Sequence, residues 1–170
     1  PKYGGHLSGT VNLPDHLTCA MMFQDPELQF ALDTPRHEIE FALENRQVSA
    51  QRIPKLTQQA LEEVGILHLA DRHFTTLSGG EQQRASLAVI IAMNPQIILL
   101  DEPFASLDFH NRTLIIQQLK KLLQTGKTII ISDHDLVAYD SLHPLIIDFN
   151  NHLQLLSSAA TQTLLDRFNQ

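Results

Sequence analysis

An apolar run that ends in two acidic residues is the feature that most constrains the fold of this chain: residues 97–102 read IILLDE. Four large apolar residues in succession predict a strand buried in a parallel sheet that helices cover. The two carboxylates, Asp101 and Glu102, then fall at the C-terminal edge of the sheet, where open α/β folds bind their ligands. The sequence therefore predicts an α/β domain with a polar site at this edge.

The rest of the chain alternates between strand-like and helix-like segments, which supports a parallel sheet with helices packed on it. Strands are predicted at 18–23, 97–100, 128–132 and 145–149. Helices are predicted at 35–45, 53–65, 78–93, 108–124 and 161–168, with a short helix after Asp135. The helices of residues 33–93 are interpreted as a subdomain inserted into a core formed by 1–32 and 94–170.

Length, charge and apolar content limit the classes of function that the chain can have. A length of 170 residues with 43% apolar content fits one domain with a core of its own. The net charge of -7 leaves no basic surface for a phosphate backbone, so nucleic acid is not an expected partner. The single cysteine, Cys19, is expected in the core and favours a reducing, cytoplasmic compartment. The longest apolar run, 87–93, is too short to span a bilayer.

The second informative segment is the helix start at 77–82, which reads LSGGEQ. Ser78 and Glu81 have the spacing of a capping box, and a helix cap is the simplest explanation of the pair. Gly79 and Gly80 add a different property, since without side chains they let a phosphate approach the free amides at the positive end of the helix dipole. The sequence therefore predicts a phosphate-binding helix start.

In this order and spacing the segments 77–82, 97–102 and 105–108 resemble the signature motif, Walker B strand and D-loop of ATP-binding cassette (ABC) ATPases. The resemblance implies a P-loop NTPase-like α/β core with a helical signature subdomain, and ATP and Mg²⁺ as ligands. It implies phosphate binding by Ser78, Gly79, Gly80 and Glu81. Asp108 resembles the D-loop aspartate, although it would also be a good N-cap for its helix.

The resemblance also implies a division of roles at the sheet edge. Asp101 would hold Mg²⁺, directly or through water, and Glu102 would polarise the attacking water. Gln24, after the first strand, resembles the Q-loop glutamine that reaches metal and water. His134 resembles the switch histidine that contacts the γ-phosphate. Asp133 departs from the family pattern, in which a small hydroxyl residue is common, and could alter the charge state of the histidine.

Residues 23–30, FQDPELQF, resemble energy-coupling factor and cobalt or vitamin importers more than cassette ATPases in general. This resemblance implies a peripheral protein on the cytoplasmic face of the membrane, with a second ATPase subunit and transmembrane subunits as partners. Gln29 could equally be an exposed helix or loop residue. Two alternatives are a soluble ABC ATPase of translation or DNA repair and a degenerate, non-catalytic module; the presence of both Glu102 and His134 argues against the second.

The phosphate loop G-x-x-x-x-G-K-[ST] that such an ATPase needs is not found in the sequence. The triplet 126–128, GKT, fails because the first glycine of the motif would fall at Lys121, and because it follows a helix and precedes a strand; Gly126 is interpreted as a helix C-cap. We expect the loop upstream of Pro1, in a longer polypeptide. This partial cassette, incomplete at its N-terminus, is expected to be inactive alone and to expose an apolar sheet face that other chains could cover.

Overall fold

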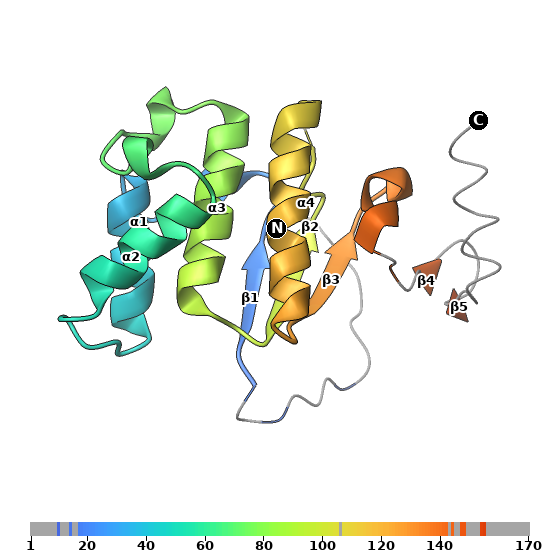
Figure 1. Cartoon of the computed structure of the whole chain (residues 1–170), viewed down its shortest axis with the longest axis horizontal. Coiled ribbons are helices and arrows are strands. Elements are labelled where there is room, and N and C mark those ends of the chain that lie inside the picture. The colour runs from blue at the N-terminus through green and yellow to red at the C-terminus, as the bar shows by residue number, and fades with distance from the viewer. Residues whose placement is uncertain are drawn as a thin grey trace.

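The computed structural model describes residues 17–105 and 107–142, together with 10, 14, 144, 147–148 and 154–155. Figure 1 shows a group of helices beside a small sheet, with one long helix lying across the sheet. In chain order the elements are β1 (Cys19–Met22), η1 (Pro26–Leu28), α1 (Pro35–Asn45), α2 (Ile53–Glu63), η2 (Leu67–Leu69), η3 (Phe74–Thr76), α3 (Gly79–Met93), β2 (Ile97–Asp101), α4 (Phe109–Gln124), β3 (Thr128–Ser132), η4 (Leu136–Leu142), β4 (Ile147–Asp148) and β5 (Gln154–Leu155).

The three strands β1, β2 and β3 form a parallel sheet in that order, with β2 in the middle. Register pairs Cys19 with Ile97 and Asp101 with Ser132. The parallel register brings the carboxyl ends of all three strands to the same edge. This arrangement confirms the predicted parallel sheet and places the expected polar edge where the sequence puts it.

Alternate residues of the strands point to the two faces of the sheet, and only one face is covered. On the covered face Met22, Ile98 and Leu100 are fully or almost fully buried. On the opposite face Met21 is 38% exposed and Ile130 is 56% exposed. An apolar sheet face is thus exposed in the described strands, as the sequence predicts. A strand buried on both faces is not what the structure shows, because helices lie on one side only of the described sheet.

The first three helices pack on one another, and α3 also packs on β1 (Figure 1). Thr34 caps α1, with its hydroxyl accepting from the amide of His37 at 3.3 Å, and Pro35 occupies the first turn. The α2 helix ends before Gly65, which has a φ of +71°. Since α3 lies between helices and sheet, its residues are buried around most of its circumference.

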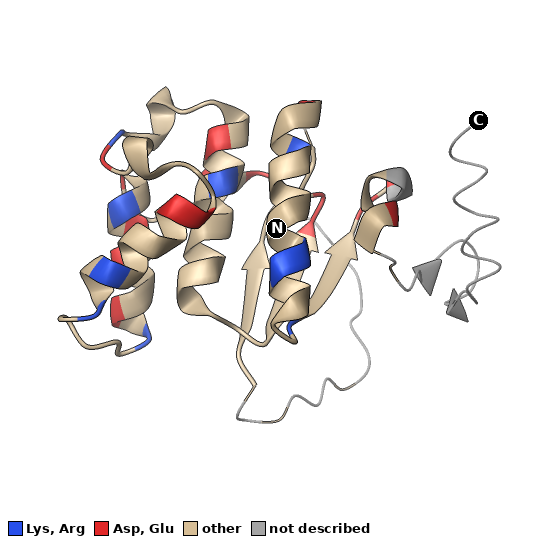
Figure 2. Ribbon diagram, viewed as in Figure 1, with Lys and Arg blue, Asp and Glu red and all other residues tan. Residues whose placement is uncertain are grey.

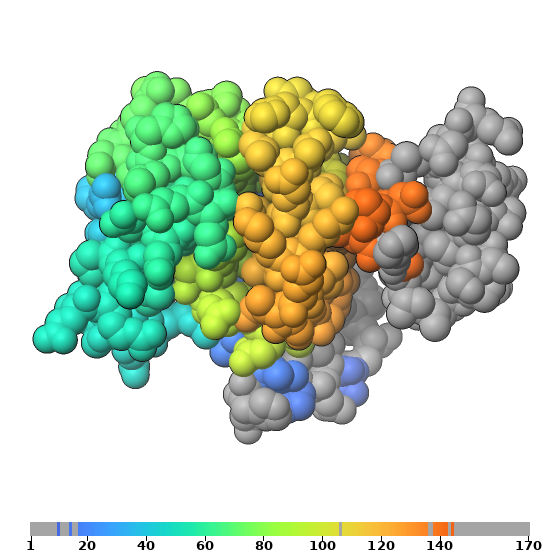
Figure 3. Space-filling view, in the orientation of Figure 1, coloured from blue at the N-terminus to red at the C-terminus, as the bar shows by residue number. Residues whose placement is uncertain are grey.

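The fourth helix lies in front of the sheet in Figure 1, packs on β3, and forms the middle of the molecular face seen in Figure 3. Ile115 and Leu119 of α4 are fully buried in the same core as Leu87 and Ile90 of α3. Asp108 is the N-cap, accepting from the amide of Asn111 at 2.8 Å. The core is therefore shared between the helical group and the sheet.

Most predicted elements are confirmed within one to a few residues at each end. Two expectations need correction. Cys19 is exposed, because it points to the uncovered face of β1. The strand predicted at 145–149 is described only at β4, which pairs antiparallel with β5 in a separate sheet. Only a few residues separate β4 from β5 in the sequence, which permits a hairpin but is too short for a parallel crossover. The helix predicted at 161–168 and segment 2–11 lie outside the described residues, apart from Thr10.

Candidate active site

The carboxyl edge of the sheet brings together the residues that the sequence singles out there. Asp101 ends β2, and Glu102 follows it, with its amide donating to the carbonyl of Ser132 at 2.8 Å. His134 comes two residues after β3, and its Nδ1 lies 3.7 Å from Oε1 of Glu102. The imidazole of His134 is 81% exposed and the side chain of Glu102 is 32% exposed, so both side chains are accessible to solvent at the carboxyl edge of the sheet. A ligand can reach both groups from the same side.

Gln24 joins this cluster from the end of β1. Its Nε2 donates to Oε2 of Glu102 at 2.8 Å, which directs the amide oxygen away from that carboxylate. Carboxylate and amide oxygens are the protein ligands that Mg²⁺ accepts, usually one or two of them together with phosphate oxygens. Within the described part of the chain no group of three or more His, Cys, Asp or Glu side chains could hold a metal. Asp101 and Gln24 supply side-chain oxygens of this kind at the strand ends, and their role as metal ligands stays a prediction.

The backbone at Glu102 is in an uncommon conformation, with a φ of +41°. Such angles are rare for residues other than glycine and persist where the surroundings impose them. Here two hydrogen bonds hold Glu102: its backbone amide donates to the carbonyl of Ser132, and its carboxylate accepts from the side chain of Gln24. The carboxylate is thus held in place at the strand end before any ligand arrives.

Asp133, the departure from the family pattern, has a structural partner. Its side chain is only 5% exposed, accepts a hydrogen bond from the hydroxyl of Tyr139, and lies 3.7 Å from Nδ1 of His134. Burial and the bond to Asp133 raise the pKa of Tyr139 far above its usual value, so the phenol stays protonated and donates. The ring of Tyr139 also stacks on Phe104 at 4.7 Å between centroids. An acid is accommodated here because a buried tyrosine pairs with it.

At the start of α3 both halves of the predicted capping box are present. The amide of Ser78 donates to the Glu81 carboxylate at 2.7 Å, and the amide of Glu81 donates to the Ser78 hydroxyl at 3.4 Å. The Ser78 amide is the main cause that lowers the pKa of Glu81, with further lowering from the Ser78 hydroxyl and nearby arginines. Both side chains are thus engaged in the cap.

The two glycines of this helix start differ in their surroundings. Gly79 is exposed, and a Cβ there would meet nothing within 4 Å. Gly80 is buried, and a Cβ there would lie 2.7 Å from Nδ2 of Asn111, in the first turn of α4. Of the predicted phosphate-binding glycines, only Gly79 faces solvent in this structure. The second glycine lies against the side chain of Asn111 from α4.

Three glutamines hold the segment around Gln24 in place. The sequence did not predict these contacts for Gln82 and Gln83, and it left the position of Gln29 undecided. Gln83 donates to the carbonyl of Gln24 at 3.1 Å, and Gln82 donates to Glu27 at 3.0 Å. Gln29 donates to the carbonyl of Met21 at 3.0 Å and accepts from the amide of Phe23 at 3.1 Å. Gln29 is therefore a brace rather than an exposed residue. The signal that could have found Gln82 and Gln83 is two amides on the inner side of an otherwise apolar helix.

Charged residues are scattered over the helices, whereas the strands carry none before their carboxyl ends (Figure 2).

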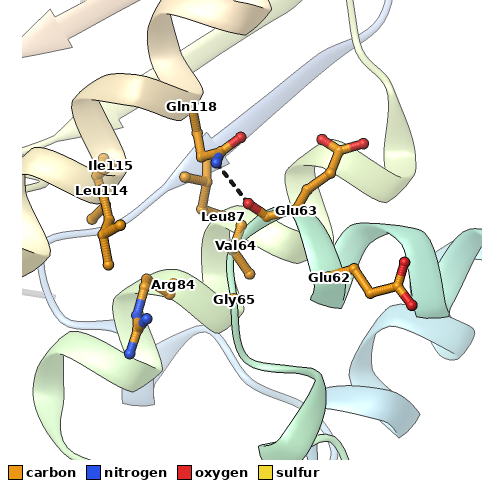
Figure 4. A pocket seen from close by; sticks show the side chains of 9 residues that line it. All are labelled: Glu62, Glu63, Val64, Gly65, Arg84, Leu87, Leu114, Ile115 and Gln118. Atoms are coloured by element: carbon orange, nitrogen blue, oxygen red, sulfur yellow. Dashed lines mark hydrogen bonds between the residues drawn. The ribbon is translucent and has the colours of Figure 1, made fainter.

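A separate hollow of about 120 Å³ lies between the end of α2, α3 and α4, and Figure 4 shows Gln118 reaching across it to the carbonyl of Glu63 at 2.6 Å. None of the residues that line the hollow is a predicted site residue. The candidate active site is therefore the open carboxyl edge of the sheet, not this hollow.

The class of protein that this fold and edge define is an α/β domain, in which a parallel sheet ends in paired acids and is packed against a helix that starts with two glycines. The model of the ABC transporter family matches residues 11–105, more than half of the chain, and the chain belongs to that family. The described helices include none long and apolar enough to cross a membrane.

Several relatives are similar to much of the chain. A Pyrococcus furiosus protein, PF0528, named an ABC transporter ATP-binding protein, is 40% identical over 115 residues, which is 68% of this chain and 43% of the relative. The energy-coupling factor transporter ATP-binding protein EcfA1 of Leuconostoc mesenteroides is 40% identical over 119 residues, 68% of this chain and 44% of the relative. The chain thus spans less than half the length of these curated relatives.

Among solved structures, cbiO1 of Clostridium perfringens, part of the ABC transporter complex cbiONQ, superposes with a TM-score of 0.64 at 32% identity, over 71% of this chain and 48% of that one. This neighbour confirms the predicted fold class, the ABC ATPase form of the P-loop NTPase fold.

Proposed function

We propose that the protein hydrolyses ATP with Mg²⁺ as the ATP-binding subunit of a membrane importer of the energy-coupling factor or cobalt type. The observation that carries this proposal is the meeting of Gln24, Glu102 and His134 at one sheet edge, from three strand ends that are far apart in sequence. A carboxylate, an amide and an imidazole on one side of an edge can act on one water and one phosphate. The sequence similarity to EcfA1 and cbiO1 supports the importer type.

In this mechanism the residues of the edge act on the water, the metal and the terminal phosphate. The Glu102 carboxylate accepts a hydrogen bond from the attacking water and orients it in line with the terminal phosphate. Gln24 holds that carboxylate at 2.8 Å and, with Asp101, offers oxygen atoms to Mg²⁺. His134 donates a hydrogen bond to the terminal phosphate, where negative charge is stabilised. When bound, Mg²⁺ neutralises phosphate charge.

The start of α3 is proposed to contact the nucleotide of a second subunit. Two such subunits would close head to tail, so that the exposed amide end at Ser78 and Gly79 of one faces the phosphate held by the other. Asp108 lies beside this end, since Asn111, which it caps, packs on Gly80. Gly80, predicted to face this phosphate together with Ser78, lies next to the exposed Gly79 and against the Asn111 side chain.

The transmembrane partner is proposed to dock on the segment after β1 and on the helical group. Leu28 is 82% exposed, and Leu32 and Phe41 are exposed on the same part of the chain. An amphipathic helix of a membrane subunit would bury these apolar side chains in the manner of a helix-in-groove complex. The glutamine contacts between this segment and α3 would transmit its position to the signature helix.

The test is Glu102→Gln in the complete gene product. We expect kcat to fall by about 10²–10⁴-fold while ATP still binds, because the amide keeps the size of the side chain and loses its basicity. ATP turnover and nucleotide affinity are measured in parallel, with Glu44→Gln on the far end of α1 as the matched control. Undiminished turnover in Glu102→Gln would remove this residue from the mechanism.

A further inference from the structure

Arg112, in the first turns of α4, lies outside every motif that the proposed function uses, yet it contacts two of the site's segments. Its Nε donates to the carbonyl of Leu107 at 3.1 Å, immediately before Asp108. Its Nη1 donates to Oδ2 of Asp135 at 2.9 Å, immediately after His134. One guanidinium thus joins the chain beside Asp108 to the chain beside His134. The planar fork of arginine suits such a double contact, which lysine cannot reproduce.

The loop that carries His134 is held on its other side by Asp133. The amide of Asp135 donates to Oδ1 of Asp133 at 2.9 Å, and the Tyr139 hydroxyl donates to Oδ2 of the same carboxylate. Both neighbours of His134 are therefore fixed, one to η4 and one to α4. The ring itself makes no hydrogen bond to the described residues, and its Nδ1 lies 3.7 Å from carboxylate oxygens of both Glu102 and Asp133.

We propose that Arg112 is a positioning residue: it holds the loop of His134 against the segment of Asp108, so that the imidazole stays opposite Glu102. A movement of the Asp108 segment, such as the approach of a second subunit would cause, is then transmitted through Arg112 and Asp135 to the histidine. The catalytic consequence rests on the proposed ATP hydrolysis, whereas the connection between the two segments does not.

The contact is suited to positioning rather than to holding the fold together. The side chains of Arg112 and Asp135 are 37% and 39% exposed, and they line an open groove between α4 and η4. Ion pairs that are this exposed contribute little to stability. Loss of the pair should therefore leave the protein folded, with a Tm lower by no more than about 3 °C.

The experiment compares Arg112→Ala, Arg112→Lys, Asp135→Asn and the double variant Arg112→Ala/Asp135→Asn in the complete gene product. We expect Arg112→Ala to lower kcat about tenfold with KM for ATP nearly unchanged, because a misplaced histidine affects the reaction more than binding. Arg112→Lys should recover part of the loss. The double variant should lose no more than the worse single variant, as residues of one connection do.

The matched control is Arg36→Ala, which breaks an exposed ion pair with Asp71 in the helical group. Equal kcat in Arg112→Ala and Arg36→Ala, or additive losses in the double variant, would overturn the positioning role. A second readout needs no nucleotide: amide hydrogen exchange at 133–139 should be faster in Arg112→Ala. If the unaltered protein does not hydrolyse ATP while exchange still responds, the proposed function is wrong and the connection stands. Unchanged exchange would overturn the connection itself.

Discussion

The start of α3 and the carboxyl edge of the sheet hold their functional groups by opposite means. At the start of α3, Ser78 and Glu81 bind each other's backbone across three residues. At the sheet edge, Gln24 reaches Glu102 across 78 residues of sequence, and His134 approaches the same carboxylate from the next strand. The first region is organised locally and the second only by the tertiary fold. Substitutions should accordingly affect helix stability in one and chemistry in the other.

After Glu102→Gln, the largest effect is expected at the same sheet edge, from His134→Ala. Loss of one hydrogen-bond donor to developing charge typically lowers kcat by about 10²–10³-fold. Since His134 is 81% exposed, the free energy of unfolding should hardly change. Steady-state turnover and thermal unfolding of the complete gene product check both halves, with the exposed His68 of η2 as the control. A large loss of stability without a loss of kcat would reverse the comparison.

The next effect separates the two glycines of α3. Gly80→Ala places a Cβ 2.7 Å from the Asn111 side chain and should lower the free energy of unfolding by about 1–3 kcal/mol. Gly79→Ala meets nothing within 4 Å and should leave stability unchanged or slightly higher. Denaturant unfolding of both variants measures the difference, and adding Asn111→Ala to Gly80→Ala should recover part of the loss. Equal stability of the two variants would mean that the Asn111 side chain moves aside without cost and that the close approach at Gly80 does not limit the packing.

The smallest effect concerns the charge of Glu81. Because its folded-state pKa lies below its usual value, the carboxylate stabilises the fold above the unfolded-state pKa, and this stabilisation is lost as pH falls through the folded pKa. Glu81→Gln should therefore cost about 0.3–1 kcal/mol at neutral pH and nothing at the acid end. Chemical unfolding from pH 7 to pH 3 measures it. Glu44→Gln, near the C-terminal end of α1, should show no such loss; a loss as large as that of Glu81→Gln would contradict the capping explanation.

The elements that the sequence predicts well are helices whose first residues include a capping residue. Thr34 and Pro35 start α1 at the predicted residue, Ser78 caps α3, and Asp108 caps α4. A cap is an interaction within one turn, so the amino-acid order contains all of it. The exposure of Cys19 and the antiparallel pairing of β4 were not predictable in this way. Both depend on which neighbours cover a strand, and a short apolar run does not specify them.

The candidate site also contains features that the sequence predicts and features that only the fold shows. The sequence supplies Asp101, Glu102 and His134 with the spacing of a known motif set, and the parallel register then brings them together. The burial of Gly80 under Asn111 and the brace formed by Gln29 appear only in the folded chain. The first joins segments that are far apart in the sequence, and the second depends on how the loop after β1 folds back on the strand.

By itself the sequence determined the order of strands and helices, their caps and the residue types available for chemistry, because these follow from periodicity and from contacts within a few residues. Only the tertiary structure decided which glycine of α3 is exposed, which face of the sheet is uncovered, and that Arg112 links the neighbours of Asp108 and His134. Those outcomes depend on side chains far apart in sequence meeting at set distances, and a linear pattern does not contain the distances.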